Sequence, residues 1–161
     1  MKTVYLSLGS NVGDRAGNIA QAIGALGARG VRVERQSSLY ETEPVELREQ
    51  PWFLNCVVEA ETELMPRQLM NALLEIERDM GRTRRTPKGP RLIDMDILFF
   101  GASVIRTAEL EIPHPRMAER RFVLVPFAEI APEARHPTLQ KSVAQLLAET
   151  PDRSEVRLWQ K

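Results

Sequence analysis

Cysteine and histidine are both scarce in this chain of 161 residues. Its one cysteine, Cys56, excludes an internal disulfide and any zinc site built from several cysteines. The two histidines, His114 and His136, lie far apart in the sequence, and no HExxH motif is present. A zinc hydrolase is therefore not expected, and the chemistry of the chain has to be sought in other side chains.

Long hydrophobic runs and net charge are also lacking. No apolar run approaches about 18 residues, so no membrane span is expected. The first ten residues lack the length and cleavage pattern of a signal peptide. The 22 basic and 22 acidic residues cancel, which argues against a protein that coats nucleic acid or an anionic membrane. We therefore expect a cytoplasmic protein that binds neither nucleic acid nor membrane. Because no amphipathic helix is left without a partner, we also expect a monomer.

Length and hydrophobic periodicity predict one domain over residues 1–161, with an α+β fold. Strands are expected at residues 4–8, 31–40, 53–62 and 93–100, and helices from Asp14 to the glycines at 27–30 and from Pro66 to Gly81. This β-α-β-β-α-β order is that of a ferredoxin-like core. Partly helical segments at 121–130 and 139–147 are expected to cover the other face of the sheet, making a three-layer α/β/α sandwich. Residues 156–159 are expected to form a last edge strand.

Two aspartates, Asp94 and Asp96, stand in the otherwise apolar segment IDMDILFF. Because strand side chains alternate, both carboxylates project from one face. Two like charges on a core strand repel each other unless a cation neutralises them. Oxygen ligands favour Mg²⁺, which usually takes one or two carboxylates and completes its shell with water and phosphate. A DxD pattern alone is also compatible with two aspartates on a solvent-exposed face.

A basic segment comes directly before these aspartates, with six Lys or Arg and one Asp in residues 78–91. Arginine matches phosphate oxygens with a planar fork, and phosphoryl transfer depends mainly on charge neutralisation. By itself, such a segment is a solvated loop or a nucleic-acid contact. Next to the paired carboxylates, it favours Mg²⁺-nucleotide chemistry.

Several other residues have two interpretations. Gly9–Gly13 follows a strand and opens a helix, so it forms either an anion cradle or a tight turn. Phe53 and Asn55 share a strand face. Either they bind a flat heterocycle, or Phe53 is a core residue and Asn55 caps the sheet. His114, fixed between two prolines, contacts phosphate or is structural. Glu77 orients a ligand or the loop arginines, or is a simple surface residue.

Six segments of the chain resemble, in order, those of the 6-hydroxymethyl-7,8-dihydropterin pyrophosphokinase family of the folate pathway. They are the GSN turn after the first strand, Tyr40–Pro44 (YETEP), Gln50–Asn55 (QPWFLN), Gly81–Arg84 (GRTR), Gly89–Ile97 (GPRLIDMDI) and Pro113–Pro115 (PHP). The resemblance covers nearly the whole chain. The combination of GPRxxDxDI with the upstream QPxFLN is far more specific than either string alone.

The resemblance implies transfer of pyrophosphate from ATP to the hydroxymethyl group of the reduced pterin, with release of AMP, on a three-layer fold with long catalytic loops. It implies that Asp94 and Asp96 bind two Mg²⁺ ions, and that Arg82 and Arg91 are catalytic residues that balance charge. The nucleotide contacts that it implies are Arg82, Arg84, Arg91, Ile97, His114 and Arg120. The pterin contacts are Thr42, Pro44, Val45, Phe53, Asn55 and Phe122, with the pterin between the two phenylalanine rings. Asn71 and Glu77 also match family positions.

The chain departs from the family pattern in the catalytic loop and near the nucleotide. Lys88 stands where well-known members have a tryptophan, and the loop is one residue shorter. Phe53 replaces a common tyrosine, which removes a hydroxyl but keeps the ring. Pro115 follows His114 where an aromatic residue is often found. Glu109 and Glu111 stand where some members have Arg and Thr near ATP, so those two contacts are not expected here.

Two other functions remain open on the residues alone. One is another Mg²⁺-dependent nucleotidyl or glycosyl transferase, because DxD also suits those enzymes. The other is a ferredoxin-like RNA-binding module that uses residues 82–91, although RNP-type aromatic residues are not found on its strands. No histidine or glutamate is compellingly placed as a general base. For the pyrophosphokinase reaction we therefore expect alignment and charge stabilisation to carry most of the acceleration.

Overall fold

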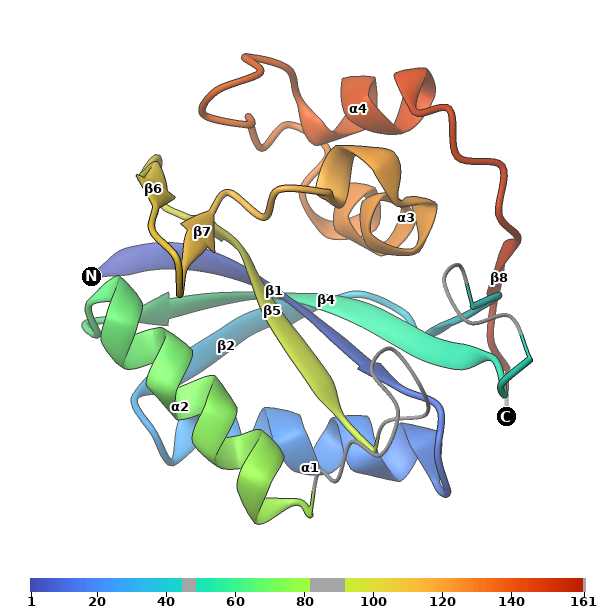
Figure 1. The fold of residues 1–161 in the computed structure, drawn as a ribbon, viewed down its shortest axis with the longest axis horizontal. Coiled ribbons are helices and arrows are strands. Elements are labelled where there is room, and N and C mark those ends of the chain that lie inside the picture. Colours follow the sequence, from blue (N-terminus) through green and yellow to red (C-terminus); the bar gives the residue numbers. More distant parts are fainter. Residues whose placement is uncertain (45–48, 82–91, 161) are drawn as a thin grey trace.

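An antiparallel sheet forms the centre of the molecule (Figure 1). The computed structural model describes residues 1–44, 49–81 and 92–160, and within these residues the sheet has six strands. Its strands are β1 (Lys2–Ser10), β2 (Val31–Gln36), β3 (Tyr40–Thr42), β4 (Phe53–Thr62), β5 (Asp94–Phe100) and β8 (Val156–Leu158). They lie in the order β5-β1-β4-β3-β8, and β2 also pairs with β4. In this order, β5 and β8 are the two outermost strands.

Helices cover both faces of this sheet. The described helices are α1 (Arg15–Gly27), α2 (Pro66–Asp79), α3 (Arg121–Ile130), α4 (Val143–Glu149) and the short 3-10 helix η1 (Met117–Glu119). Figure 1 shows α1 and α2 on one face, and α3 and α4 on the other. A small hairpin, β6 (Ile105–Arg106) with β7 (Glu111–Ile112), follows β5. No described helix is long and apolar enough to span a membrane.

The core is divided by the sheet into two hydrophobic clusters, because strand side chains alternate between its faces. Val4, Leu6 and Leu8 of β1 pack towards α1 and α2. Tyr5 and Val57 pack on the opposite side, in the cluster that contains Phe127 of α3. A register shift between β1 and β5 falls at Tyr5/Leu6, so that Leu98 and Phe99 both join the α3 cluster. Before this shift, the side chains of residues 94–97 of β5 alternate regularly between the two faces of the sheet.

The local signals for the first two helices are confirmed. Asp14 caps α1, because its carboxylate accepts the N–H of Gly17 at 3.1 Å. Pro66 is the first residue of α2, where the missing N–H of proline has no intrahelical partner to lose. Gly81 follows this helix with a φ of +79°, a conformation that favours glycine. Cys56 is buried in the core as expected, and burial raises the pKa of its thiol to about 12.

Two predicted boundaries are wrong. The expected strand over residues 31–40 is interrupted between β2 and β3, because the Ser37 hydroxyl accepts the N–H of Val57 at 3.0 Å in place of a regular ladder. The expected helix over 139–147 begins only at Val143, since the backbone N–H of Leu139 is bonded to the His136 ring and Gln140 has a φ of 56°. The helix at 121–130 and the edge strand near 156–159 are confirmed.

Candidate active site

The floor of the candidate site is a row of residues across three neighbouring strands. Asn55 of β4 pairs with Gly9 of β1, and Gly9 pairs with Asp94 of β5. In the next row on this face, Ser7 pairs with Val57 and with Asp96. Because Val57 and Tyr5 point towards α3, alternation places Asn55, Gly9 and both aspartates on that same face. Register therefore brings together an amide and two carboxylates from segments about 40 residues apart.

Gly9 leaves room for the Asn55 side chain. A Cβ atom at position 9 would lie 2.4 Å from Oδ1 of Asn55 and 3.4 Å from its Cγ. Real Cβ atoms do not approach another heavy atom so closely. Gly9 lies within β1, and the close approach of the Asn55 side chain explains why a glycine stands there. Neither an anion cradle nor a tight turn gives this explanation.

Asn55 and Thr42 form a buried polar pair beside this floor. Asn55 is 7% exposed and Thr42 is 1% exposed, and Asn55 Nδ2 donates to Thr42 Oγ1 at 2.7 Å. Phe53 lies two residues before Asn55, half-buried and on the same face of β4. Pro44 is buried, just beyond the end of β3. The pair fixes the orientation of the Asn55 amide.

Phe122 of α3 and Arg120, the residue directly before α3, approach this face, because α3 packs against β4. Phe122 is half-buried beside the α3 cluster, and the Arg120 guanidinium lies 5.6 Å from the centre of its ring. A cation at this distance from an aromatic ring is attracted by the negative face of the ring. The structure thus puts Phe53, Asn55, Thr42 and Phe122 on the α3 side of the sheet, as four of the predicted pterin contacts require.

His114 is held against β5 by its backbone, whose N–H donates to the carbonyl oxygen of Leu98 at 3.1 Å. The ring nitrogen Nδ1 accepts the N–H of Arg116 at 3.2 Å, so in the neutral ring the proton is on Nε2. Burial and the positive charge of Arg120 lower the pKa of His114 to about 4, against the opposing effect of Asp94 and with a further contribution from Arg116. At neutral pH this ring is an uncharged hydrogen-bond donor.

A cavity of about 310 Å³ opens between α2, the start of β5 and the β6–β7 hairpin. Its lining consists of Met70, Leu73, Leu74, Met95, Asp96, Ile97, Ala108, Glu109, Leu110, Glu111, His114 and Pro115. Two predicted nucleotide contacts, Ile97 and His114, therefore share one cavity with the predicted metal ligand Asp96. The α2 side of this cavity was not predicted from the sequence. Leu74 is 50% exposed in the structure. The available signal was a leucine that lies outside the apolar face of Leu69, Leu73 and Ile76.

Glu77 of α2 is a buried residue, only 4% exposed, so its interpretation as a simple surface residue is wrong. Its carboxylate accepts the backbone N–H of Met95 at 2.8 Å. Met95 stands between Asp94 and Asp96 in the strand at the end of the sheet. Glu77 therefore fixes the backbone from which both carboxylates project. Asn71, the other family position on α2, is exposed.

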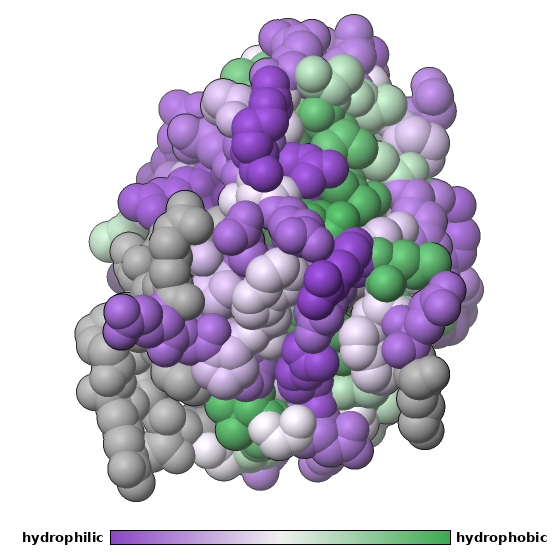
Figure 2. Space-filling view, turned by 90° about the vertical axis from the view of Figure 1, so that its right-hand side faces the viewer, coloured by the Kyte–Doolittle hydropathy of each residue, from purple (hydrophilic) through white to green (hydrophobic). Residues whose placement is uncertain are grey.

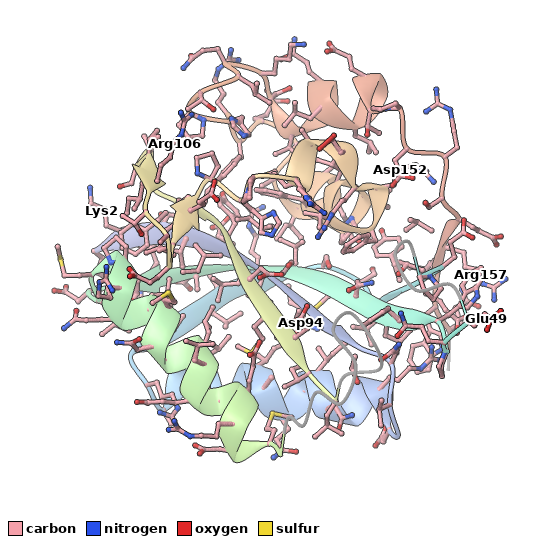
Figure 3. The ribbon with its side chains drawn as sticks, viewed as in Figure 1. Lys2, Glu49, Asp94, Arg106, Asp152 and Arg157 are labelled. Atoms are coloured by element: carbon pink, nitrogen blue, oxygen red, sulfur yellow. The ribbon has the colours of Figure 1, made fainter. Side chains whose placement is uncertain are left out.

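The donor set at Asp94 and Asp96 suits a hard divalent cation. Both side chains are partly exposed, and Figure 3 shows Asp94 near the beginning of β5. Among the residues that the structure describes, no three His, Cys, Asp or Glu side chains group closely enough to hold a metal by themselves. Mg²⁺ does not need such a group, because it commonly takes one or two carboxylates together with water and substrate phosphates. These two aspartates fit that pattern.

Four predicted site residues lie outside the described residues. They are Val45, Arg82, Arg84 and Arg91. The basic segment and its closure over a nucleotide therefore stay predictions from the sequence. The residues before and after it, Gly81 and Leu92, connect α2 to β5, so the segment joins two elements that line the cavity.

Comparison with known proteins gives one consistent family. The family model described as 7,8-dihydro-6-hydroxymethylpterin-pyrophosphokinase (HPPK) matches residues 5–132. A Bacillus subtilis protein, 2-amino-4-hydroxy-6-hydroxymethyldihydropteridine pyrophosphokinase, is 44% identical over 156 residues, which cover 96% of this chain and 89% of that protein. Folic acid synthesis protein fol1 of Pneumocystis carinii is 43% identical over 143 residues, covering 89% of this chain and 19% of that protein.

The matches differ in how much of each relative they cover. This chain spans 19%, 22% and 25% of the Pneumocystis, Dictyostelium and Pisum sativum relatives that it matches. Among solved structures, wild-type Plasmodium falciparum HPPK-DHPS with pterin and p-hydroxybenzoate superposes with a TM-score of 0.73 at 19% identity. That superposition covers 92% of this chain and 41% of the Plasmodium chain, and it shows a shared fold.

Proposed function

Because the chain belongs to the 7,8-dihydro-6-hydroxymethylpterin-pyrophosphokinase family, we propose that it transfers the diphosphate group of ATP to the hydroxymethyl group of 6-hydroxymethyl-7,8-dihydropterin. The products are AMP and the pterin diphosphate, and the reaction is a step of folate biosynthesis. One observation carries the proposal: the Asn55–Gly9–Asp94 row joins an amide to the paired aspartates beside the cavity. A flat acceptor and a charged nucleotide would meet at this row.

The acceptor binds on the Asn55 side of the row. Asn55 donates one amide hydrogen to Thr42, which leaves its Oδ1 and its second hydrogen to pair with the amide-like edge of a pterin. Phe53 and Phe122 supply rings for stacking on the heterocycle. Pro44 and, from the sequence, Val45 complete this pocket. A pocket with one oriented amide discriminates strongly against acceptors that cannot satisfy it.

The nucleotide binds on the Asp96 side, with its base in the cavity lined by Ile97 and Leu74. Neutral His114 donates a hydrogen bond from Nε2 to a phosphate oxygen or to the nucleotide, and its low pKa keeps it from acting as a cation at neutral pH. Arg120 supports the nucleotide from η1 and α3. The sequence adds Arg82, Arg84 and Arg91 as phosphate ligands, with Arg82 and Arg91 balancing the charge that builds up during transfer.

Asp94 and Asp96 would hold Mg²⁺, two ions by the family resemblance, and Glu77 fixes the strand that carries these two residues. When bound to these carboxylates, Mg²⁺ would supply positive charge that offsets the charge of the triphosphate. The residues of this chain mainly align the hydroxymethyl group with the β-phosphorus and exclude water. The oxygen of the primary alcohol attacks the β-phosphorus, and the bond from that phosphorus to the α,β-bridging oxygen breaks. AMP leaves with the bridging oxygen, and the alcohol proton passes to solvent.

We also propose that the fold is a ferredoxin-like core extended to a three-layer sandwich. The strand order β5-β1-β4-β2 and the position of α1 and α2 on one face support a ferredoxin-like core. The layer of α3 and α4 supports its extension to a three-layer α/β/α sandwich. One domain over residues 1–161, a monomeric state and a cytoplasmic location stay predictions from the sequence.

Product analysis tests the proposed function. The protein is mixed with ATP, Mg²⁺ and 6-hydroxymethyl-7,8-dihydropterin, and nucleotides and pterins are separated. AMP is expected in equal amount to the pterin diphosphate, with neither product when the pterin or Mg²⁺ is omitted. Release of ADP or free pyrophosphate would instead indicate another transferase. ATP binding without AMP formation would mean that the Asn55 pocket accepts a different molecule.

A further inference from the structure

The last described strand, β8, is attached to β3, the strand that carries Thr42. Pairing joins Tyr40 to Leu158, Glu41 to Arg157 and Thr42 to Val156. Just beyond Thr42, the backbones of Glu43 and Glu155 are also connected, and Glu155 N–H donates to Glu43 Oε1 at 2.8 Å. Segments more than 110 residues apart therefore meet at the edge of the proposed acceptor pocket.

Apolar burial contributes to this attachment chiefly through Trp159, which follows β8, is half-buried and packs against the cluster that contains Leu6. Leu158 is 53% exposed, and Val156 is only half-buried. Figure 2, which faces the side of the molecule that carries β8, shows hydrophilic side chains over most of this surface. Within the β3–β8 pairs themselves, hydrogen bonds and charge therefore contribute more than apolar burial does.

Glu41 is the centre of that charge network. Its Oε1 accepts from Arg157 Nη2 at 3.0 Å, and its Oε2 accepts from Arg15 Nη1 of α1 at 2.9 Å. Partial burial acts to raise the pKa of Glu41, but hydrogen bonds from Arg157 and Arg15 outweigh it and lower the pKa. Glu41 therefore stays ionised between two arginines from two different elements.

Trp52 connects the same network to β4. The Arg157 guanidinium lies 4.7 Å from the centre of the Trp52 ring, and Arg15 Nη1 also donates to the Trp52 carbonyl oxygen at 2.9 Å. Figure 3 shows Arg157 at the edge of the molecule where β8 runs. One arginine thus contacts β3 by an ion pair and the start of β4 by a cation–π contact.

We infer that Arg157 is a positioning residue for the acceptor pocket. Glu41 points towards α1, whereas its neighbours Tyr40 and Thr42 point towards α3, where Tyr40 donates to Glu129 at 2.6 Å. Arg157 therefore holds β3 from one face while Thr42 orients Asn55 on the other. Loss of this hold lets β3 shift, which weakens the Thr42–Asn55 hydrogen bond. This inference rests on the proposed function, because Asn55 is there the ligand of the pterin.

The test compares Arg157→Ala and Arg157→Lys with Arg153→Ala, a matched control on the same segment. Arg153 Nη1 donates to the Thr150 carbonyl oxygen at 2.8 Å, within its own segment. Arg157→Ala is expected to raise both Kd and KM for the pterin by about 3- to 10-fold, with the Kd for ATP and kcat nearly unchanged. Arg157→Lys should lie between, because lysine keeps the charge but not the planar fork. Arg153→Ala should match the wild type.

Hydrogen exchange gives a second measurement that does not depend on activity. Amides of residues 40–43 should exchange faster in Arg157→Ala than in Arg153→Ala, with β1 unchanged. Glu41→Gln, which keeps the size of the side chain, should give the same pattern from the β3 side. This variant also serves if Arg157→Ala does not fold.

Three outcomes would overturn the inference. They are an unchanged pterin Kd in Arg157→Ala, an equal loss of pterin and ATP affinity, and an equal effect of Arg153→Ala. The wild type separates this failure from that of the proposed function. If the wild type makes AMP and the pterin diphosphate, only the role of Arg157 is wrong. If the wild type neither binds the pterin nor forms AMP, the proposed function is wrong and the inference falls with it.

Discussion

A single methyl group at position 9 tests the central row of the site. Gly9→Ala places a Cβ atom 2.4 Å from Asn55 Oδ1, about 1 Å closer than ordinary van der Waals contact. The Asn55 side chain must move by about that amount, which stretches its 2.7 Å hydrogen bond to Thr42 beyond hydrogen-bonding range. Overpacking and a lost buried hydrogen bond each cost about 1–3 kcal/mol. We expect Gly9→Ala to lower the free energy of unfolding by about 2–4 kcal/mol.

The same displacement should weaken pterin binding. Because the amide of Asn55 is the proposed ligand of the pterin edge, loss of its orientation should raise the pterin Kd by about 10-fold or more, at 1.4 kcal/mol per factor of ten. Urea unfolding gives the stability, and titration calorimetry gives the two Kd values. The Kd for ATP should change much less, since the nucleotide cavity lies on the other side of the row.

Two comparisons make this prediction specific. Gly24→Ala in α1 is the matched control, because nothing lies within 4 Å of its Cβ position. It should stabilise the helix by about 0.5–1 kcal/mol. Removal of the Asn55 side chain relieves the clash, so Gly9→Ala in an Asn55→Ala background should cost little further stability. Wild-type stability and pterin affinity in Gly9→Ala would refute the close approach.

Three further predictions follow from the metal ligands, the strand that carries them and the second histidine. Asp96→Asn should remove the Mg²⁺ dependence of nucleotide binding and raise the Kd for Mg²⁺-ATP by about 10-fold or more; a Mg²⁺ titration like that of the wild type would exclude it as a ligand. Glu77→Ala leaves the buried Met95 N–H without its acceptor and should lower the free energy of unfolding, measured with urea, by about 2 kcal/mol. Glu77→Gln keeps an acceptor oxygen and should recover part of that loss, and wild-type stability of both variants would contradict this prediction. Burial lowers the pKa of His136 below its unfolded value of about 6.5. The unfolded chain therefore binds more protons at this residue, and the free energy of unfolding should fall as the pH drops below about 6.5. In His136→Gln this free energy should fall less steeply between about pH 7 and 5, and the same slope as in the wild type would contradict the prediction.

Much of the fold follows from local patterns. Alternation and periodicity predict β4 at residues 53–62 and α3 at 121–130, and both have those bounds in the structure. The break between β2 and β3 could not be found in this way, because it depends on a hydrogen bond from Val57 to the hydroxyl of Ser37. The strand near residue 156 was expected at an edge, but its pairing with β3 is a contact between distant segments.

The candidate site was predictable where one strand carries two functional residues at positions i and i+2. Asp94 and Asp96 share a face by alternation alone, and Phe53 and Asn55 do the same. The contribution of Glu77 was not predictable, because sequence spacing cannot show that a helix carboxylate meets the N–H of Met95. Leu74 was also not predicted, because it lines a cavity only through the position of the β6–β7 hairpin opposite it, which the sequence does not show.

The sequence by itself determined the family, the residue types of the site and the order of the elements, because motifs and periodicity are properties of neighbouring residues. Only the tertiary structure decided the register that puts Asn55, Gly9 and Asp94 in one row. It also decided that Arg157 reaches Glu41 and Trp52. Register and long-range contacts depend on how whole faces pack, and a shift of one residue would turn every side chain of a strand to the opposite face.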